Sequence, residues 1–223
     1  MRRAGRFLRD NALLLALTAL VVLLWSTPVV VPLKILTVLF HEIAHAAAAT
    51  LTGGEVVRLT VDLRQGGHAI TAGGSRFLIL SAGYLGSLLI GAAIFLAAHR
   101  GRSDRAVLAG LGVLLGGVAL WAVRDMIGFA LCAAAALAML AAARFLPVAA
   151  ADLILRLIGL TSLIYVPLDI FDDTLRRSGE ISDARLLATE IGGATVVWGA
   201  LWLAVSLVVI ALTLRAGLGR GRG

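Results

Sequence analysis

The sequence predicts an all-α polytopic membrane protein with about six to seven transmembrane helices and one small β-hairpin. Its residues are 60% hydrophobic and its mean hydropathy is +0.98, more apolar than soluble domains of this size usually are. Apolar blocks long enough to cross a bilayer recur along the chain. No soluble stretch exceeds about 25 residues, so we expect a single integral membrane domain over residues 1–223.

Seven apolar segments account for most of the chain, with boundaries uncertain by several residues. They cover roughly residues 11–26, 29–51, 77–98, 105–123, 126–144, 148–170 and 191–213. The net charge of +7 comes largely from arginines at segment ends, such as Arg2, Arg3, Arg6 and Arg9 before the first segment and Arg215, Arg220 and Arg222 after the last. This placement is typical of contacts with a lipid bilayer. We therefore expect a multi-pass protein of the cell membrane and no nucleic-acid partner.

One stretch between the second and third segments has the periodicity of a β-strand. In "VVRLTVDLRQGGHAITAG" apolar and polar residues alternate, beginning at Val57, and the sequence Gln65-Gly66-Gly67 follows as a turn signal. A second short strand is expected from His68 to Ala72. The pattern predicts a β-hairpin at about residues 55–73.

Two further patterns concern the packing of the membrane helices. Asp152 and Arg156 are four residues apart within an apolar segment, so they can pair on one helix face. Gly83, Ser87 and Gly91 repeat at a spacing of four residues, which lets helix backbones approach closely in lipid. We expect close helix packing along this stripe.

The stretch "LFHEIAHAAAA" places three ionisable groups inside an apolar helix expected at about residues 29–51. A charge at the centre of a membrane helix costs roughly 2.5–3.5 kcal/mol, so such residues usually have a function. His41 and His45, at positions i and i+4, share a helix face and can bind one zinc ion, and Glu42 lies beside that ion as the acid/base. A histidine pair that hydrogen-bonds neighbouring helices is the alternative.

A catalytic zinc ion usually takes three protein ligands, so a third ligand is needed. His99 and His68 are poorly placed for this role, whereas Asp169, Asp172 and Asp173 end the segment at about 148–170. Asp169 is deepest in its helix and is the first choice. Asp172 and Asp173 remain alternatives, one helical turn further out.

An HExxH in an early membrane helix, then a β-hairpin, a glycine-rich helix and a late Pro-Leu-Asp resemble the site-2 protease family of intramembrane zinc metalloproteases, and within it the small bacterial subgroup. The resemblance covers roughly residues 30–98 and 160–175. It implies that His41 and His45 bind zinc, that Glu42 is the catalytic acid/base, and that Asp169 is the aspartate of the family's Leu-Asp-Gly motif.

The sequence departs from the family at two places. Ile170 stands where the family has glycine, which keeps Asp172 and Asp173 open as the third ligand. "SAGYLGSLL" has the glycines of the family's substrate-side loop but not its asparagine, for which Ser87 is the expected substitute.

The expected function is that of a zinc endopeptidase, with one zinc ion per chain, that hydrolyses peptide bonds in or near membrane-spanning segments. Its expected partners are the bilayer, a membrane-protein or membrane-anchored peptide substrate and, as an open option, a regulatory membrane protein. A non-proteolytic metal-binding membrane protein and a transport or scaffold protein are the alternatives. The substrate-binding candidates lie on the hairpin and on the glycine-rich helix: Val57, Leu59, Val61, His68, Ile70, Gly83 and Ser87.

Overall fold

The structure is a computed structural model that describes residues 11–100, 103–177 and 179–217. Its elements are α2 (Ala12–Leu23), α3 (Val31–Leu51), β1 (Glu55–Val61), β2 (Gly67–Ala72), α4 (Arg76–Arg100), α5 (Asp104–Trp121), α6 (Met126–Phe145), α7 (Val148–Phe171), the π-helical turn η1 (Asp172–Arg176), α8 (Asp183–Glu190) and α9 (Thr195–Gly217). The basic residues of the two tails, Arg2, Arg3, Arg6, Arg9, Arg220 and Arg222, lie outside the described residues.

Six helices in the described part of the chain are long and apolar enough to cross a membrane: α3, α4, α5, α6, α7 with η1, and α9. The predicted fold class, six to seven such helices with one small hairpin, is confirmed. The first predicted segment, 11–26, forms the 12-residue helix α2, which is shorter than the roughly 20 residues that span a bilayer. The chain is a multi-pass membrane protein by this architecture.

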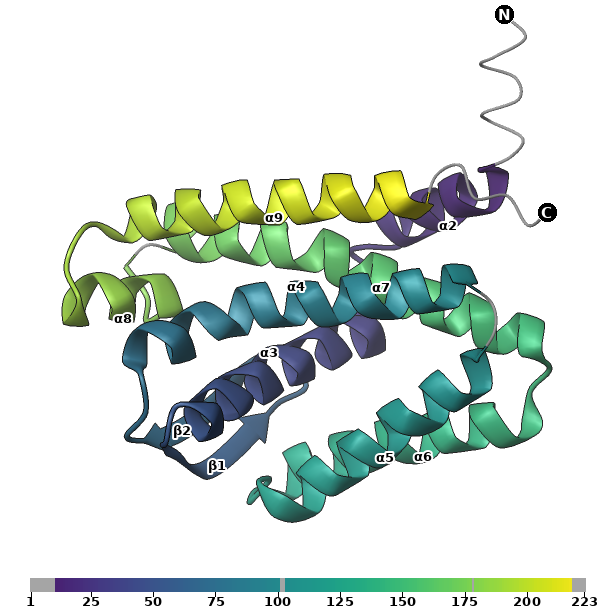
Figure 1. Cartoon of the computed structure of the whole chain (residues 1–223), viewed down its shortest axis with the longest axis horizontal. Helices are drawn as coiled ribbons and strands as arrows, with labels where there is room; N and C mark the ends of the chain where they lie inside the picture. Colours follow the sequence, from purple (N-terminus) through teal and green to yellow (C-terminus); the bar gives the residue numbers. More distant parts are fainter. Residues whose placement is uncertain (1–10, 101–102, 178, 218–223) are drawn as a thin grey trace, which may run out of the picture.

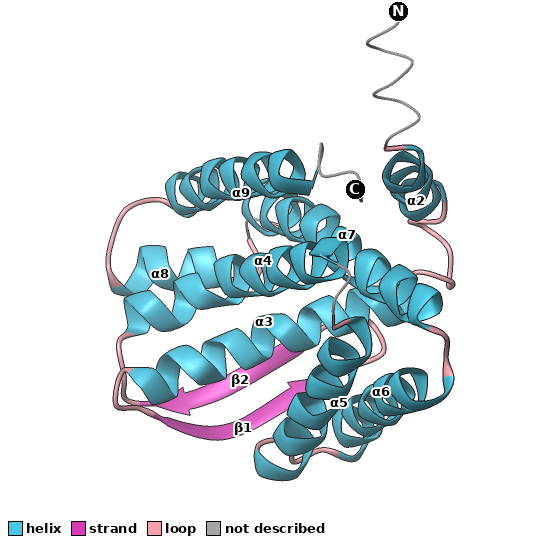
Figure 2. Cartoon of the chain, turned by 45° about the vertical axis from the view of Figure 1, so that its right-hand side comes forward, coloured by secondary structure: helices cyan, strands magenta, loops and turns pink. Residues whose placement is uncertain are grey.

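Helix α4 is the central element of the bundle (Figure 1). It packs against α3 on one side and against α7 and α9 on the other, while α5 and α6 form a helical pair beside this group. The hairpin lies along α3 (Figure 2). One apolar core joins α3, β1, α5 and α6 with parts of α4 and α7, and a second joins α4, α7, α8 and α9 with α2. Helix α3 is therefore held between the hairpin and the rest of the bundle.

The two strands pair antiparallel, from Glu55 opposite Ala72 to Val61 opposite Gly67. A bulge at Val57 breaks the regular alternation of the first strand. Consequently Leu59 and Val61 are buried, whereas Val57 is exposed. The first strand ends at Val61, earlier than its alternating pattern suggests, because the Asp62 carboxylate accepts hydrogen bonds from the backbone N–H groups of two turn residues, Arg64 at 2.7 Å and Gly66 at 2.9 Å.

The outer edge of β1 is already occupied. The Leu59 N–H donates to the carbonyl of Ala122, at 2.9 Å, in the connection between α5 and α6. Leu59 stands opposite Ala69 in the sheet. In an antiparallel pair of strands, the N–H and C=O groups of two opposite residues either all point toward the partner strand or all point away from it. Because Leu59 points away from β2, the N–H and C=O of Ala69 point out along the other edge. The outer edge of β2 therefore presents backbone groups that β1 does not use.

The expected packing features of the membrane helices are present. The Arg156 guanidinium donates to the Asp152 carboxylate at 2.9 Å, so the predicted i,i+4 pair is confirmed. A side chain at Gly91 would collide with Ser162 on α7, whose hydroxyl donates to the backbone carbonyl of Ser87 at 3.0 Å. Close packing of α4 against α7 depends on this glycine.

Replacing Gly91 with alanine is expected to lower the thermal unfolding temperature of the purified protein in detergent. Overpacking of a well-filled contact costs about 1–3 kcal/mol. The matched control is Gly117→Ala, because a Cβ at Gly117 meets no atom within 4 Å. Equal unfolding temperatures for Gly91→Ala and the parent protein would contradict the role of this contact.

Candidate metal centre

The HExxH residues lie in the middle of α3, and the helical spacing sets their geometry. His41 and His45 are one turn apart on one face of the helix, with ring centroids separated by 4.6 Å. Glu42 comes directly after the first histidine and is buried, with 4% of its surface exposed. The helix thus brings two imidazoles and one carboxylate to the same level of the bundle.

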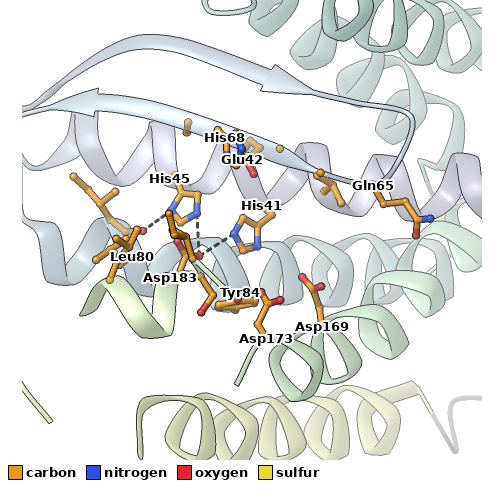
Figure 3. A pocket seen from close by; sticks show the side chains of 18 of the residues that line it. His41, Glu42, His45, Gln65, His68, Leu80, Tyr84, Asp169, Asp173 and Asp183 are labelled. Atoms are coloured by element: carbon orange, nitrogen blue, oxygen red, sulfur yellow. Dashed lines mark hydrogen bonds and ion pairs between the residues drawn. The ribbon is translucent and has the colours of Figure 1, made fainter. Parts of the chain in front are cut away.

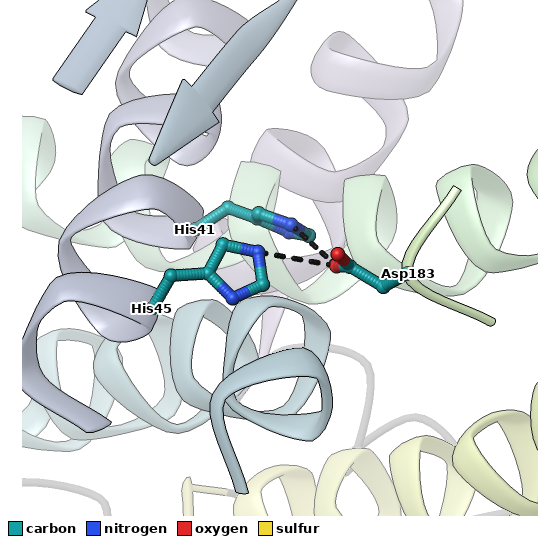
Figure 4. Close-up of side chains that lie close together, drawn as sticks. All are labelled: His41, His45 and Asp183. Carbon is teal, nitrogen blue, oxygen red and sulfur yellow. Dashed lines mark hydrogen bonds and ion pairs between the residues drawn. The ribbon is translucent and has the colours of Figure 1, made fainter. Parts of the chain in front are cut away.

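A third side chain, Asp183, meets the two imidazoles from the far end of the sequence (Figure 4). Its Oδ2 atom lies 3.0 Å from Nε2 of His41 and 3.2 Å from Nε2 of His45. In a tetrahedral site with metal–ligand distances of about 2.0 Å, neighbouring ligand atoms lie roughly 3.3 Å apart. In the described part of the chain, these three side chains form the group that can hold a metal ion.

A hydrogen bond of the second ring nitrogen of His45 supports the view that these three side chains can hold a metal ion. Its Nδ1 lies 2.6 Å from the backbone carbonyl oxygen of Ile79 on α4. A carbonyl can only accept, so Nδ1 carries the proton, and in a neutral imidazole Nε2 then has a free lone pair. The lone pair of His45 and the Asp183 carboxylate point toward the same position. Two electron-rich groups placed in this way are stabilised by a cation between them. Fixing the tautomer through the other ring nitrogen is typical of metal-binding histidines.

The short helix α8 positions Asp183 at its first residue. Ser182 caps this helix, since its hydroxyl accepts from the N–H of Arg185 at 3.3 Å. At the other end, Glu190 accepts two hydrogen bonds from Arg76 at the start of α4, and this contact lowers the pKa of Glu190. Burial alone would raise the pKa of Asp183, but in the metal-free protein protonated His45 and His41 beside it hold that pKa well below its usual range.

Two glycines make room for the centre. A Cβ at Gly83 on α4 would collide with Nε2 of His41 and of His45, so only glycine lets α4 pass beneath the imidazoles. A Cβ at Gly67, at the start of β2, would lie 2.6 Å from Oε1 of Glu42. The hairpin therefore rests directly on the glutamate.

The centre opens into a cavity of about 330 Å³ (Figure 3). Side chains from α3, the hairpin, α4, the end of α7 and α8 surround it. Besides the metal-centre residues and Glu42, its lining includes Gln65, Gly67, His68, Ala69, Tyr84, Asp169, Asp173 and Arg177. The first residues of β2 thus form one wall of a cavity that reaches the metal centre.

The three aspartates considered from the sequence have other positions. Asp169 lines the cavity but does not belong to the metal-binding group. Asp173 accepts hydrogen bonds from the Tyr84 hydroxyl at 2.5 Å and from Arg177 at 2.7 Å. Asp172 pairs with Arg176 at 3.1 Å. Asp169 and Asp173 line the cavity at the centre, Asp172 does not, and Asp183 is the aspartate that meets both imidazoles.

The substrate-binding candidates are also spread over several environments. His68 lines the cavity, and Gly83 lies beneath the two imidazoles. Ser87 is fully buried, where its hydroxyl donates to the carbonyls of Gly83 and Tyr84. Leu59 and Val61 belong to the apolar core, and Val57 and Ile70 are exposed outside the residues that line the cavity.

Sequence reasoning missed Asp183 and Tyr84. Asp183 lies in the polar connection that follows the segment at about 148–170, whereas the candidate aspartates all stand at the end of that segment. A local signal was present, since Ser182-Asp183 begins a short helix with the N-cap pattern of a serine followed by an acid in the first turn. Tyr84 contacts the His41 ring edge-on at a centroid distance of 4.8 Å, a position that no sequence pattern indicated.

Comparison with known proteins gives one result that covers nearly the whole chain. The family model described as Peptidase M50B-like matches residues 14–213, which include every residue of the centre. No curated protein and no solved structure matched the chain. Together with the HExxH helix, the neighbouring hairpin and the three side chains that could hold a metal ion, this match shows that the chain belongs to the Peptidase M50B-like family, which is the site-2 protease family.

Proposed function

We propose that the protein is an intramembrane zinc-dependent endopeptidase of the cell membrane. The observation that carries the proposal is the convergence of His41, His45 and Asp183 within 4.8 Å of one another, beside a buried glutamate and at the wall of an open cavity. Two imidazoles and one carboxylate with room for a further ligand are a typical donor set of catalytic zinc. Asp183 replaces Asp169 in this proposal as the third ligand.

A zinc ion bound by His41, His45 and Asp183 would supply a Lewis acid for the peptide carbonyl and for the attacking water. Glu42 takes up the proton of that water and gives it to the leaving amine. The carboxylate suits this role because it is next to His41 in the chain and lines the cavity. The hairpin packs directly against Glu42, whose side chain is largely buried.

The outer edge of β2 presents the substrate. A peptide bond inside a helix is shielded by its own hydrogen bonds, so the substrate must be extended when it reaches the centre. Gly67, His68 and Ala69 line the cavity, and the outward N–H and C=O of Ala69 can pair with such a segment. The occupied edge of β1 leaves β2 as the docking strand.

The open cavity favours proteolysis over a purely structural metal site. Structural zinc sites usually have four protein ligands and are closed, whereas the group here has three and faces a cavity of about 330 Å³. The ligands and Glu42 gather at one place, which favours a reaction centre over a transport path. Substrates are then membrane proteins or membrane-anchored peptides.

Glu42→Gln is expected to retain zinc and to lose proteolytic activity, because the amide keeps the shape of the side chain but cannot carry the proton. General bases contribute roughly 10²–10⁴-fold to rate. The measurement is cleavage of an apolar model peptide in detergent, followed by mass spectrometry, with the metal content of each sample determined. The matched control is Glu55→Gln, which alters an exposed acid at the start of β1. Full activity in Glu42→Gln would remove this residue from the reaction.

Ala69→Pro is expected to reduce cleavage of the same peptide about tenfold, since proline removes an outward N–H that pairs with the substrate. Zinc content and unfolding temperature should stay at the parent values, because this N–H is not used within the hairpin. Proline at Thr60 or Ile70 is a weaker test, since their backbone groups point into the hairpin and the substitution damages it directly. Unchanged turnover in a folded, zinc-loaded Ala69→Pro protein would show that β2 is not the docking edge.

A further inference from the structure

A second cavity, of about 220 Å³, adjoins the one at the metal centre, and we call it the Lys34 cavity. Gln65, Asp169 and Arg177 line both cavities, so the two are neighbours. In Figure 3 Gln65 and Asp169 both lie on the side of the site away from His45. The Lys34 cavity is lined mostly by polar and charged groups, and its charged residues are Lys34, Arg64, Arg177, Asp169 and Asp172.

Lys34 is the unusual member of this set. It is the only lysine of the chain, it lies in the membrane-spanning helix α3, and only 9% of its surface is exposed. Its ammonium group lies 4.3 Å from the centroid of the Trp25 ring, a cation–π contact, and forms no ion pair with any residue that the structure describes. A buried ammonium group without an ion pair is suited to an anionic partner.

The other charges of the cavity are largely paired with one another or with neighbours. Asp172 pairs with Arg176, and Arg177 pairs with Asp173. Arg64, on the hairpin turn, forms no ion pair within the described ranges, and neither does Lys34. Two cations therefore face the single remaining carboxylate of Asp169. The cavity has a surplus of positive charge and can take an anion.

The distance from the metal centre follows from the helix. Lys34 and His41 are seven residues apart, which is about two turns of α3, so they share a face with an axial separation of about 10.5 Å. An extended peptide advances about 3.3 Å per residue. A substrate that lies extended at the centre therefore reaches the level of Lys34 after three residues. A segment paired with β2 also passes the turn that carries Arg64 and Gln65.

We propose that the Lys34 cavity is a substrate subsite that binds the carboxylate of an aspartate or glutamate about three residues from the scissile bond. Lys34 donates to this carboxylate, and Arg64 closes the cavity from the side of the hairpin turn. The inference rests on the proposed function, because it places the carboxylate relative to a peptide bond at the metal centre. It makes Lys34 a specificity-determining residue.

The test uses the zinc-loaded full chain in detergent with synthetic apolar peptides of one sequence, whose cleavage bond is first located by mass spectrometry. Single aspartates are then placed at each of the five positions on either side of that bond, and each is paired with an asparagine peptide. We expect the aspartate peptide to have a kcat/KM roughly tenfold above its asparagine partner at the third position on one side, as a charge-assisted hydrogen bond allows. In Lys34→Gln this ratio should fall to about one, and in Lys34→Glu a lysine at that position should become the favoured residue.

The control variant is Arg144→Gln, which removes a cation of α6 that lines neither cavity and should keep the tenfold ratio. A ratio near one at every position in the parent protein would overturn the proposal. A tenfold ratio that survives in Lys34→Gln would overturn it as well, because the acid would then be recognised elsewhere.

A binding measurement separates this inference from the proposed function. Because Lys34 is the only lysine, isotope-labelled lysine gives one side-chain NMR signal, which can be followed in the Glu42→Gln variant. We expect it to shift with the aspartate peptide and to stay in place with the asparagine peptide, even if the parent protein cleaves neither. A signal that responds to phosphatidylglycerol and not to the aspartate peptide would overturn the proposal in favour of a lipid site.

Discussion

The meeting of one carboxylate oxygen with two imidazole nitrogens is the contact on which the arrangement of α3, α4 and α8 depends. Asp183 comes from a short helix more than 130 residues after His41 and His45, and its Oδ2 lies within 3.2 Å of both rings. Helix α4 must pass close beneath the same rings, which Gly83 permits. The hydrogen bond that His45 Nδ1 donates to the Ile79 carbonyl joins α3 to α4 and sets the tautomer of His45. Side-chain size and hydrogen bonding together define the centre.

Much of the fold could be predicted because the relevant signals are local. The length of the apolar segments predicts spanning helices, a period of two predicts the hairpin, and a spacing of four predicts the Asp152–Arg156 pair. The first segment is the exception, since the chain turns after Leu23 and α2 is too short to span. The bulge at Val57 is another, because one extra residue in a strand leaves no mark in the hydrophobic pattern.

The candidate site could be predicted only in part, for a similar reason. His41, Glu42 and His45 share one helix, so their spacing alone places them together. The third acid is brought in by tertiary structure, and the sequence offered several aspartates of equal chemistry. Depth in a helix favoured Asp169, but the turn η1 and the following connection return the chain to the centre and bring Asp183 to the imidazoles. No local spacing in the sequence indicates this return of the chain.

The two cavities and the outer edge of β2 lie next to one another and together form the surface on which the proposed extended substrate would bind. The outer edge of β1 is used by Ala122, the hairpin rests on Glu42, and the turn at Gln65 joins the metal centre to the Lys34 cavity. In the proposed function, cleavage and recognition both draw on this short hairpin.

The most direct measurement of the central claim is the zinc content of purified single variants in the same detergent. The parent protein and Asp169→Asn should hold about one zinc ion per chain, whereas Asp183→Asn and His45→Ala should hold far less. The two aspartate variants are matched in chemistry and differ only in position, so they separate the third ligand from a neighbouring acid of the cavity. Zinc retained in Asp183→Asn and lost in Asp169→Asn would contradict the account.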